Sequence, residues 1–291
     1  MAKTPYSFEK LIKEITDWAE PRPDMRLAIV LGSRARTVMP ADEWSDLDIV
    51  FVVENPSLYL DSTDWLNNID NVKILFLEPT AIGGGTERRV LFECGLDVDF
   101  SFLSEAQMKQ EIQGKPDPGV LQIYGRGYRV LFDKDKIVPP LWQLPEVPVT
   151  LRLLTPGEFS EVANDFWYHA IWTAKKLRRG ELWTALRCCD FYMKRLLLRV
   201  VECYAQIQHG GHYDTWYDGR FLERWADPHV VKGLRNAFAR YSREDIKQAL
   251  LATMDLFRWV TREIAGRGGY LYPVTLDEYA ANLVNALLSD Y

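Results

Sequence analysis

The chain contains few cysteines and no excess of positive charge. Its 291 residues include four cysteines, whose spacing does not match that of zinc ligands. A disulfide scaffold is therefore excluded, and we expect buried thiols in a reducing compartment. The formal net charge is −6 at pH 7. Because a polyanion-binding surface needs clustered basic residues, the composition disfavours nucleic acid as a partner.

The chain also lacks an apolar leader segment and any hydrophobic run of membrane-spanning length. We therefore expect a cytoplasmic protein with no membrane partner. The four histidines are scattered without a metal-ligand pattern, which favours core or surface roles over catalysis. The sequence does not fix the oligomeric state, so a monomer and a dimer both stay open.

Short apolar runs separated by turns dominate the first half of the chain. A helical apolar face over residues 7–20 ends at Pro21 and Pro23, because proline cannot continue a helix. The turn at Glu93-Cys94-Gly95 predicts a hairpin, so part of the sheet should be antiparallel. A further helix is expected over residues 61–69. The predicted strands are residues 26–31, 47–53, 72–77, 88–92, 96–103 and 128–132.

The second half of the chain has the periodicity of helices. Apolar stripes at helical spacing predict helices over residues 159–177, 182–205, 230–241, 243–264 and 276–288. Before them, prolines accumulate between residues 139 and 156, as in a linker. The predicted fold class is α+β. We expect an N-terminal catalytic domain over residues 1–138 with a mixed β-sheet and flanking helices. A Pro-rich linker, 139–156, and an α-helical bundle domain, 157–291, should follow it.

Two carboxylates follow a Gly-Ser turn in the first domain. Gly32-Ser33 ends an apolar run, and Asp46-Leu47-Asp48 opens the next predicted strand. Because side chains alternate along a strand, Asp46 and Asp48 should point to the same side. Neighbouring carboxylates repel one another unless a cation lies between them, and their oxygens suit Mg²⁺. A Gly-Ser turn lets backbone N–H groups approach a phosphate. The pattern predicts a metal-dependent phosphate-transfer site.

Either half of this pattern alone has a simpler interpretation. An Asp-x-Asp is often an exposed strand end or an Asx turn, and Gly-Ser after a strand is often only a turn. Their order, spacing and strand context, however, resemble the signature of the nucleotidyltransferase superfamily, in which Gly-Ser is followed by Asp-hydrophobic-Asp. That resemblance implies a third acid on a neighbouring strand.

The segment from Leu96 to Phe102 offers the third acid. Asp97 and Asp99 share one face of the predicted strand. We favour Asp99, because superfamily members place this acid in a hydrophobic-Asp-hydrophobic-Ser/Thr run; Asp97 either assists or lies at the rim. The resemblance implies that Asp46, Asp48 and Asp99 form the catalytic centre and hold two Mg²⁺ ions. Asp99 would accept the proton of the attacking hydroxyl, and pyrophosphate would leave the α-phosphorus of ATP.

The chain as a whole resembles a narrower family. The acidic motifs are followed by Asn164-Asp165-Phe166-Trp167 and by Ala174–Leu182, on two predicted helices. This order is similar to that of the aminoglycoside 6-adenylyltransferase (streptomycin adenylyltransferase) family. The resemblance implies a Mg²⁺-dependent nucleotidyltransferase. Such an enzyme transfers AMP from ATP to a hydroxyl of a cationic, streptomycin-like aminoglycoside and so confers antibiotic resistance.

The resemblance also implies nucleotide-binding residues. Gly32, Ser33 and Arg34 would bind phosphates, and Lys175 would place a cation against the triphosphate, with Lys176 as the alternative. A pocket for a polycationic acceptor should be acidic. Its candidate acids on the helical domain are Glu161, Asp165, Glu181, Asp214 and Asp218.

Two other functions stay open at this point. The same chemistry could act on another small-molecule or protein acceptor. A non-catalytic, nucleotide-binding regulator could also keep this fold, although the intact Gly-Ser turn and the three acids count against it.

Overall fold

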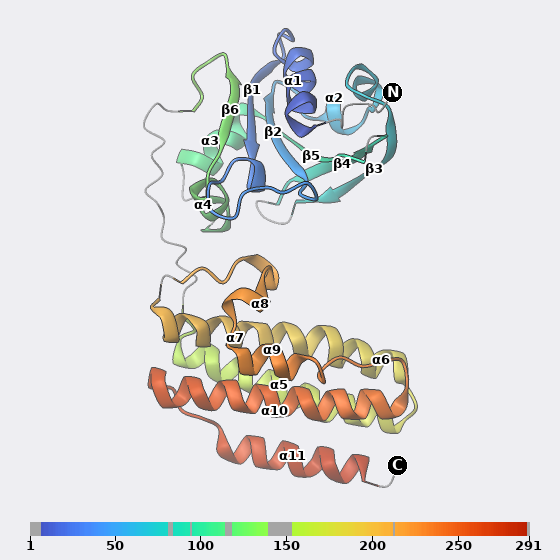
Figure 1. The fold of residues 1–291 in the computed structure, drawn as a ribbon, viewed down its shortest axis with the longest axis vertical. Helices are drawn as coiled ribbons and strands as arrows, with labels where there is room; N and C mark the ends of the chain where they lie inside the picture. The colour runs from blue at the N-terminus through green and yellow to red at the C-terminus, as the bar shows by residue number, and fades with distance from the viewer. Residues whose placement is uncertain are drawn as a thin grey trace. The chain divides into compact units, whose positions relative to one another are not determined.

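The computed structural model describes residues 7–80, 84–93, 95–113, 118–138, 153–211 and 213–289. The chain divides into two compact units, residues 1–147 and 148–291 (Figure 1). Most of the predicted linker, 139–156, lies outside the described residues, as do Cys94 and His212. The three predicted domain boundaries stay a prediction.

The first unit is built on a six-stranded mixed sheet. The strands lie in the order β3-β4-β5-β2-β1-β6 (Figure 1). Neighbours pair antiparallel except β2 and β5, which run parallel. The sheet and the helices described below confirm the predicted α+β class, and the predicted β4–β5 hairpin pairs as expected. The strands are β1 (Met25–Leu31), β2 (Leu47–Val53), β3 (Val72–Pro79), β4 (Thr86–Phe92), β5 (Asp97–Leu103) and β6 (Arg129–Asp133).

Helices cover both faces of this sheet. Helix α1 (Phe8–Ala19) begins at Ser7, whose hydroxyl accepts a hydrogen bond from the Lys10 N–H, and it buries an apolar stripe against one face. Helices α3 (Glu105–Gln113) and α4 (Pro118–Gly125) cover the other face, where Met108 and Val120 are buried. Helix α3 was not predicted, because its residues are polar nearly all round. Such a helix depends on packing and has no apolar stripe to predict it.

The predicted helix over residues 61–69 is wrong. A short α2 (Ser57–Leu60) and a 3₁₀ helix, η2 (Asp64–Asn68), stand there instead. The buried indole of Trp65 donates hydrogen bonds to the carbonyls of Tyr59 and Ser62 at 3.1 and 3.0 Å. Leu66 N–H bonds to the carbonyl of Thr63, three residues back. Burial of Trp65 therefore fixes a tighter turn than an α-helix allows.

The second unit is helical throughout its regular structure. Its longest helices pack around one apolar core, in which Phe166 stacks on Phe257 with ring centroids 3.6 Å apart. A capping box between Thr155 and Glu158 begins the first of them. The helices are α5 (Pro156–Arg178), α6 (Leu182–Arg187), α7 (Met193–His209), α8 (Leu222–Trp225), α9 (Pro228–Leu234), α10 (Arg243–Gly268) and α11 (Val274–Leu288).

Two helical predictions in this unit need correction. The expected helix over residues 182–205 contains a π-helical turn, Cys188–Tyr192, between α6 and α7. The expected helix over 230–241 ends early, because α9 stops at Leu234. The N–H groups of Arg235, Asn236 and Ala237 bond to carbonyls three residues back, so the chain tightens into a turn after α9. Beyond this turn, the N–H of Ala239 bonds to the Asp190 carboxylate at 3.0 Å.

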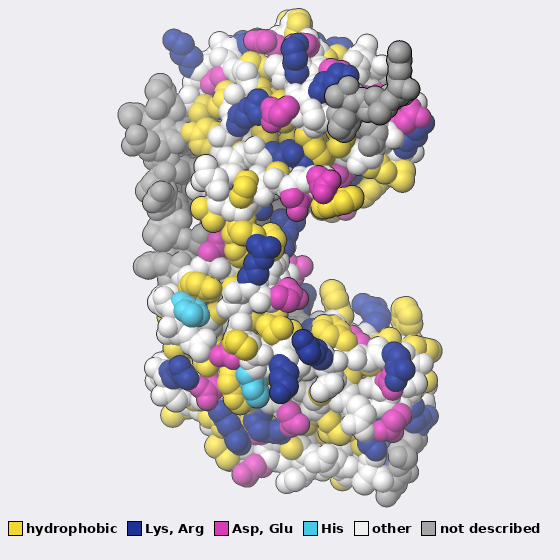
Figure 2. All heavy atoms as spheres, viewed as in Figure 1, with side chains coloured by type: hydrophobic (Ala, Val, Ile, Leu, Met, Phe, Trp, Pro, Cys, Tyr) yellow, Lys and Arg dark blue, Asp and Glu magenta, His cyan; other side chains and the backbone are white. Residues whose placement is uncertain are grey.

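The distribution of surface charge and the burial of the cysteines agree with what the composition predicts. Acidic and basic side chains are interspersed over the face of each unit that Figure 2 shows. Cys188, Cys189 and Cys203 are buried and free. Among the helices in the described part of the chain, none combines the length and apolarity needed to span a bilayer.

Candidate active site

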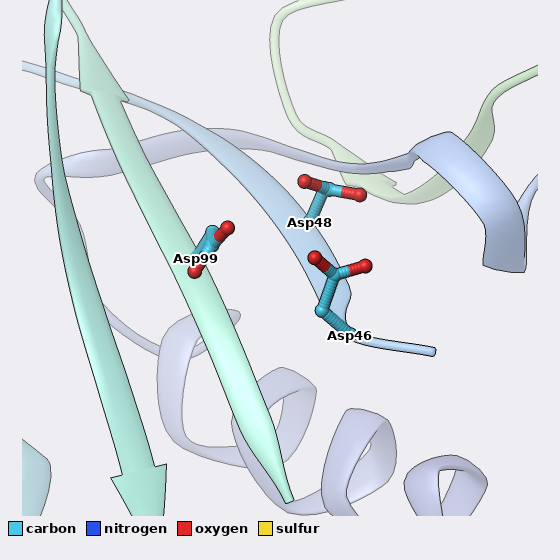
Figure 3. A group of neighbouring side chains, drawn as sticks. All are labelled: Asp46, Asp48 and Asp99. Atoms are coloured by element: carbon cyan, nitrogen blue, oxygen red, sulfur yellow. The ribbon is translucent and has the colours of Figure 1, made fainter. Parts of the chain in front are cut away.

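Three carboxylates meet where β2 begins beside β5. The parallel pairing sets Asp48 directly opposite Asp99, and Asp46 immediately precedes β2. One oxygen from each of the three side chains lies within 4.8 Å of the others. Figure 3 shows Asp46 and Asp48 on the β2 side of this group and Asp99 on β5. The structure therefore brings together the three acids that the sequence singled out.

Strand alternation explains why these acids share one face. Val98 and Phe100 belong to the core beneath α1, so Asp99 between them points to the opposite face. Asp48 lies in the same way between the buried Leu47 and Ile49. Asp97, at the first residue of β5, is exposed and does not belong to the group. The geometry thus separates the two acids that sequence patterning left together.

Asp99 is buried, with 6% of its surface exposed. Burial raises the pKa of its carboxyl group, and the nearby Asp48 and Asp46 raise it further, to about 7. The guanidinium of Arg89 opposes this shift from 3.1 Å. A carboxylate whose pKa lies near neutrality can take up a proton at physiological pH, as a general base requires.

Arg89 is a site residue that the sequence analysis missed. It lies opposite Asp99 in the antiparallel β4–β5 register and also forms ion pairs with Glu78 and Glu87. Counting residues back across the predicted hairpin could have found it. Arg89 partly neutralises Asp99, while its other two partners hold the guanidinium in place.

The three carboxylates fit a hard divalent cation. Their oxygens converge, and such ligands suit Mg²⁺. Arg89 offsets part of the repulsion between the acids, and a bound cation would relieve more of it.

Gly32 lies directly against Asp48. Its φ is +66°, in the left-handed region, and a Cβ there would come within 2.1 Å of Asp48 Oδ2. Only glycine meets both conditions. The next residue, Ser33, has a buried hydroxyl with no hydrogen-bond partner in the described part of the chain. An unpaired buried hydroxyl beside the acids fits the predicted phosphate contact.

Arg34 holds the loop that leads into β2. Its guanidinium donates to the carbonyls of Asp46 at 2.9 Å, Asp42 at 3.3 Å and Ser45. It also stacks over the Phe8 ring, 3.2 Å from the centroid. The structure therefore assigns Arg34 a bracing contact, and phosphate binding by this residue stays a prediction.

The two candidate lysines of the helical unit differ in their surroundings. Lys176 forms an ion pair with Glu181 at 2.8 Å and lies over the Trp172 ring. Lys175 is exposed, with no ion pair to any of the residues the structure describes. An available ammonium favours Lys175, whose role stays a prediction.

An acidic cavity of about 760 Å³ lies on the helical unit. Glu161 and Asp165, two of the five candidate acids, line it together with Glu158, Tyr168 and Arg199. The other candidates have different positions: Glu181 pairs with Lys176 and Arg179, and Asp214 accepts the Trp216 N–H at 2.8 Å. Asp218 lies in a short 3₁₀ segment, Tyr217–Gly219, at a φ of +53°.

Comparison with known proteins identifies the family. The family model described as streptomycin adenylyltransferase matches residues 7–287. This chain belongs to the streptomycin adenylyltransferase family. Among relatives of this family member, the aminoglycoside 6-adenylyltransferase of Campylobacter jejuni is 24% identical over 285 residues, covering 95% of this chain and 94% of that protein. The Staphylococcus aureus protein of the same name is 20% identical, covering 97% and 98%.

A solved structure is similar over the same extent. The crystal structure of an aminoglycoside 6-adenyltransferase from Bacillus subtilis has 18% identity and a TM-score of 0.46, covering 97% of this chain and 98% of that one. The matched region of this streptomycin adenylyltransferase family member includes the Gly-Ser turn, the three acids and Lys175.

The raised pKa of Asp99 predicts a pH-dependent affinity for Mg²⁺. Because the ion binds the ionised carboxylate, the affinity should fall about ten-fold for each pH unit below 7 and level off above it. The stability of the metal-free protein should depend on pH in the opposite direction. The raised pKa means that folded Asp99 binds more protons than unfolded Asp99, so its contribution to the free energy of unfolding declines as pH rises towards 7.

Calorimetric titration of the full chain with MgCl₂ at pH 5.5, 6.5 and 8 measures this dependence. Titrations in buffers of different ionisation enthalpy should detect release of a proton below pH 7. The Asp99→Asn variant should bind more weakly and lose most of the pH dependence. Equal affinities for the wild type at all three pH values would contradict the prediction.

Proposed function

We propose that this protein transfers AMP from ATP to a hydroxyl group of a streptomycin-like aminoglycoside. The observation that carries the proposal is the convergence of Asp46, Asp48 and Asp99 in a chain of this family. The two named relatives are aminoglycoside 6-adenylyltransferases, which supports an aminoglycoside as the acceptor.

Different residues of the site would bind the metal ions and the phosphates of ATP. Asp46, Asp48 and Asp99 would hold two Mg²⁺ ions, which neutralise charge on the triphosphate and the leaving pyrophosphate. Gly32 and Ser33 bind the β- and γ-phosphates through backbone N–H groups and the unpaired Ser33 hydroxyl. Lys175 adds a cation against the triphosphate. These contacts fix the α-phosphorus for in-line attack.

Asp99 takes the proton as the new bond forms. The acceptor oxygen attacks the α-phosphorus, the bond from that phosphorus to the bridging oxygen breaks, and pyrophosphate leaves. The hydroxyl proton passes to the carboxylate of Asp99. The products are adenylylated acceptor, pyrophosphate and one proton.

An acidic cavity supports a cationic acceptor. Glu158, Glu161 and Asp165 line one wall of the cavity on the helical unit, and Tyr168, 63% exposed, offers an aromatic ring beside them. Carboxylates attract the several ammonium or guanidinium groups of an aminoglycoside. A polyanionic acceptor would be repelled there.

Pyrophosphate release tests the proposal. Purified protein with ATP and Mg²⁺ should release pyrophosphate when streptomycin is added, and mass spectrometry should find streptomycin heavier by one AMP. The Asp48→Asn variant, prepared in the same way, controls for contaminating activity and should release none. Omission of Mg²⁺ should also stop the reaction.

The outcomes separate the alternatives. If ATP binds but no member of an aminoglycoside panel is modified, the acceptor is a different molecule and the proposal is wrong in its substrate. If Mg²⁺-dependent ATP binding is absent as well, a non-catalytic regulator is the better interpretation.

A further inference from the structure

An exposed tryptophan stands beside the catalytic carboxylates. Trp44 is 85% exposed and precedes Asp46 by two residues. Two residues of extended chain span at most about 7 Å, so the Cα atoms of Trp44 and Asp46 are near neighbours. By contrast, Trp18 and Trp65 of the same unit pack in or against the core, where they stack on each other. The exposed indole of Trp44 is therefore accessible to a ligand.

The backbone that carries Trp44 is fixed by hydrogen bonds. The Asp42 carboxylate accepts from the Trp44 N–H at 3.0 Å and from the Ser45 hydroxyl at 2.8 Å. The Ser45 Oγ in turn accepts from the Asp42 N–H at 3.0 Å. The Arg34 guanidinium donates hydrogen bonds to the backbone carbonyls before and after Trp44, those of Asp42, Ser45 and Asp46. The backbone at Trp44 is therefore already ordered, so ligand binding costs little further backbone freedom there.

The charges around Trp44 favour a cation. Asp42 and Glu43 are exposed directly before it, and Asp46 follows. The nearby Arg34 directs its donors to backbone carbonyls. An indole face carries partial negative charge and attracts cations, and it also packs well against the apolar faces of sugar rings. The exposed carboxylates of Asp42 and Glu43 strengthen this preference.

We propose that Trp44 and Glu43 bind the cationic, hydroxylated ring of the acceptor and position its hydroxyl group beside Asp99. This inference rests on the proposed function and adds to it the residues of the first unit that recognise the acceptor. Trp44 contributes ring contact and cation–π attraction, and Glu43 contributes charge. ATP binding does not depend on either side chain.

Two substitutions of Trp44 and one control variant test this role. With streptomycin as the probe, Trp44→Ala should weaken binding, measured by calorimetry without ATP, roughly ten-fold. The KM for streptomycin at saturating ATP should rise by a similar factor, and the KM for ATP should stay within about two-fold. Trp44→Phe keeps a ring and should recover most of the affinity. Trp183→Ala removes a tryptophan that is 65% exposed on α6 and should change neither quantity.

A neutral variant measures the contribution of the Glu43 charge to streptomycin binding. Glu43→Gln should weaken streptomycin binding at low salt and have a smaller effect at high salt, because exposed charges are screened. All four variants should melt at the temperature of the wild type, since each replaces an exposed residue.

The inference fails if Trp44→Ala leaves both the dissociation constant and the KM for streptomycin within two-fold of the wild type. It also fails if the substitution raises the KM for ATP alone, because the indole would then serve the nucleotide. Failure of the proposed function looks different: the wild-type protein itself would form no adenylylated streptomycin.

Discussion

Asp99→Asn is expected to lower the turnover number for adenylyl transfer by at least about three orders of magnitude. Asparagine keeps the size of the side chain but cannot accept the hydroxyl proton. It also removes one anionic ligand from the group of three carboxylates. Quenched-flow or steady-state measurement of pyrophosphate release at saturating ATP and streptomycin gives the turnover number directly.

Asp97→Asn is the matched control, because both acids begin the same strand and share a face. Asp97 is exposed and lies outside the carboxylate group, so its variant should keep turnover within about three-fold of the wild type. The melting temperature of Asp99→Asn should not fall, since the change removes a buried charge that faces two others. A large loss in Asp97→Asn with turnover retained in Asp99→Asn would reverse the assignment of the base.

Asp277→Ala is expected to destabilise the helical unit by about 3–5 kcal/mol. Asp277, at the start of α11, is 2% exposed. It accepts hydrogen bonds from Arg258 of α10 at 2.8 Å and from the hydroxyl of Tyr272. Burial favours a raised pKa, but these hydrogen bonds outweigh it and hold the pKa of Asp277 below its usual value. Removing the carboxylate leaves the Arg258 guanidinium without its buried partner.

Urea unfolding followed by circular dichroism at 222 nm measures this loss. Asp255 provides the control, because it pairs with the same Arg258 but its side chain is 75% exposed. Asp255→Ala should cost less than about 1 kcal/mol. Because the folded-state pKa of Asp277 is lowered, its contribution should be complete above the unfolded-state pKa and disappear as pH falls through the folded value. Equal effects for Asp255→Ala and Asp277→Ala would contradict the prediction.

The strands that build the site were predictable because their patterns are local. The apolar run after Asp46 matches β2, and the alternation around Asp99 gives the correct face of β5. Predictions failed where single hydrogen bonds decide the conformation. The indole of Trp65 bonds to the carbonyls of Tyr59 and Ser62, and the first N–H groups after α9 bond three residues back. Neither contact leaves a periodic signal in its own segment.

The candidate site was predictable to a similar extent. Asp46 and Asp48 follow from a short motif and strand alternation, whereas the choice of Asp99 over Asp97 came from the resemblance to the superfamily. The ion pair of Arg89 with Asp99 and the hydrogen bonds of Arg34 could not be predicted, because each depends on how separate segments pack together. The contacts of Arg34 with the carbonyls of the following loop could not be predicted from the sequence, and the phosphate contact that the family resemblance implies for this residue stays a prediction.

The parallel pairing of β2 with β5 also bears on how this protein folds. Asp48 and Asp99 face each other across that pair, yet β3 and β4 lie between them in the sequence. Pairing strands that are distant in the sequence costs loop-closure entropy, and here it also brings like charges together. A cation that binds only the assembled pair stabilises the folded state by mass action. The proposed metal site would therefore make the free energy of unfolding rise with the Mg²⁺ concentration.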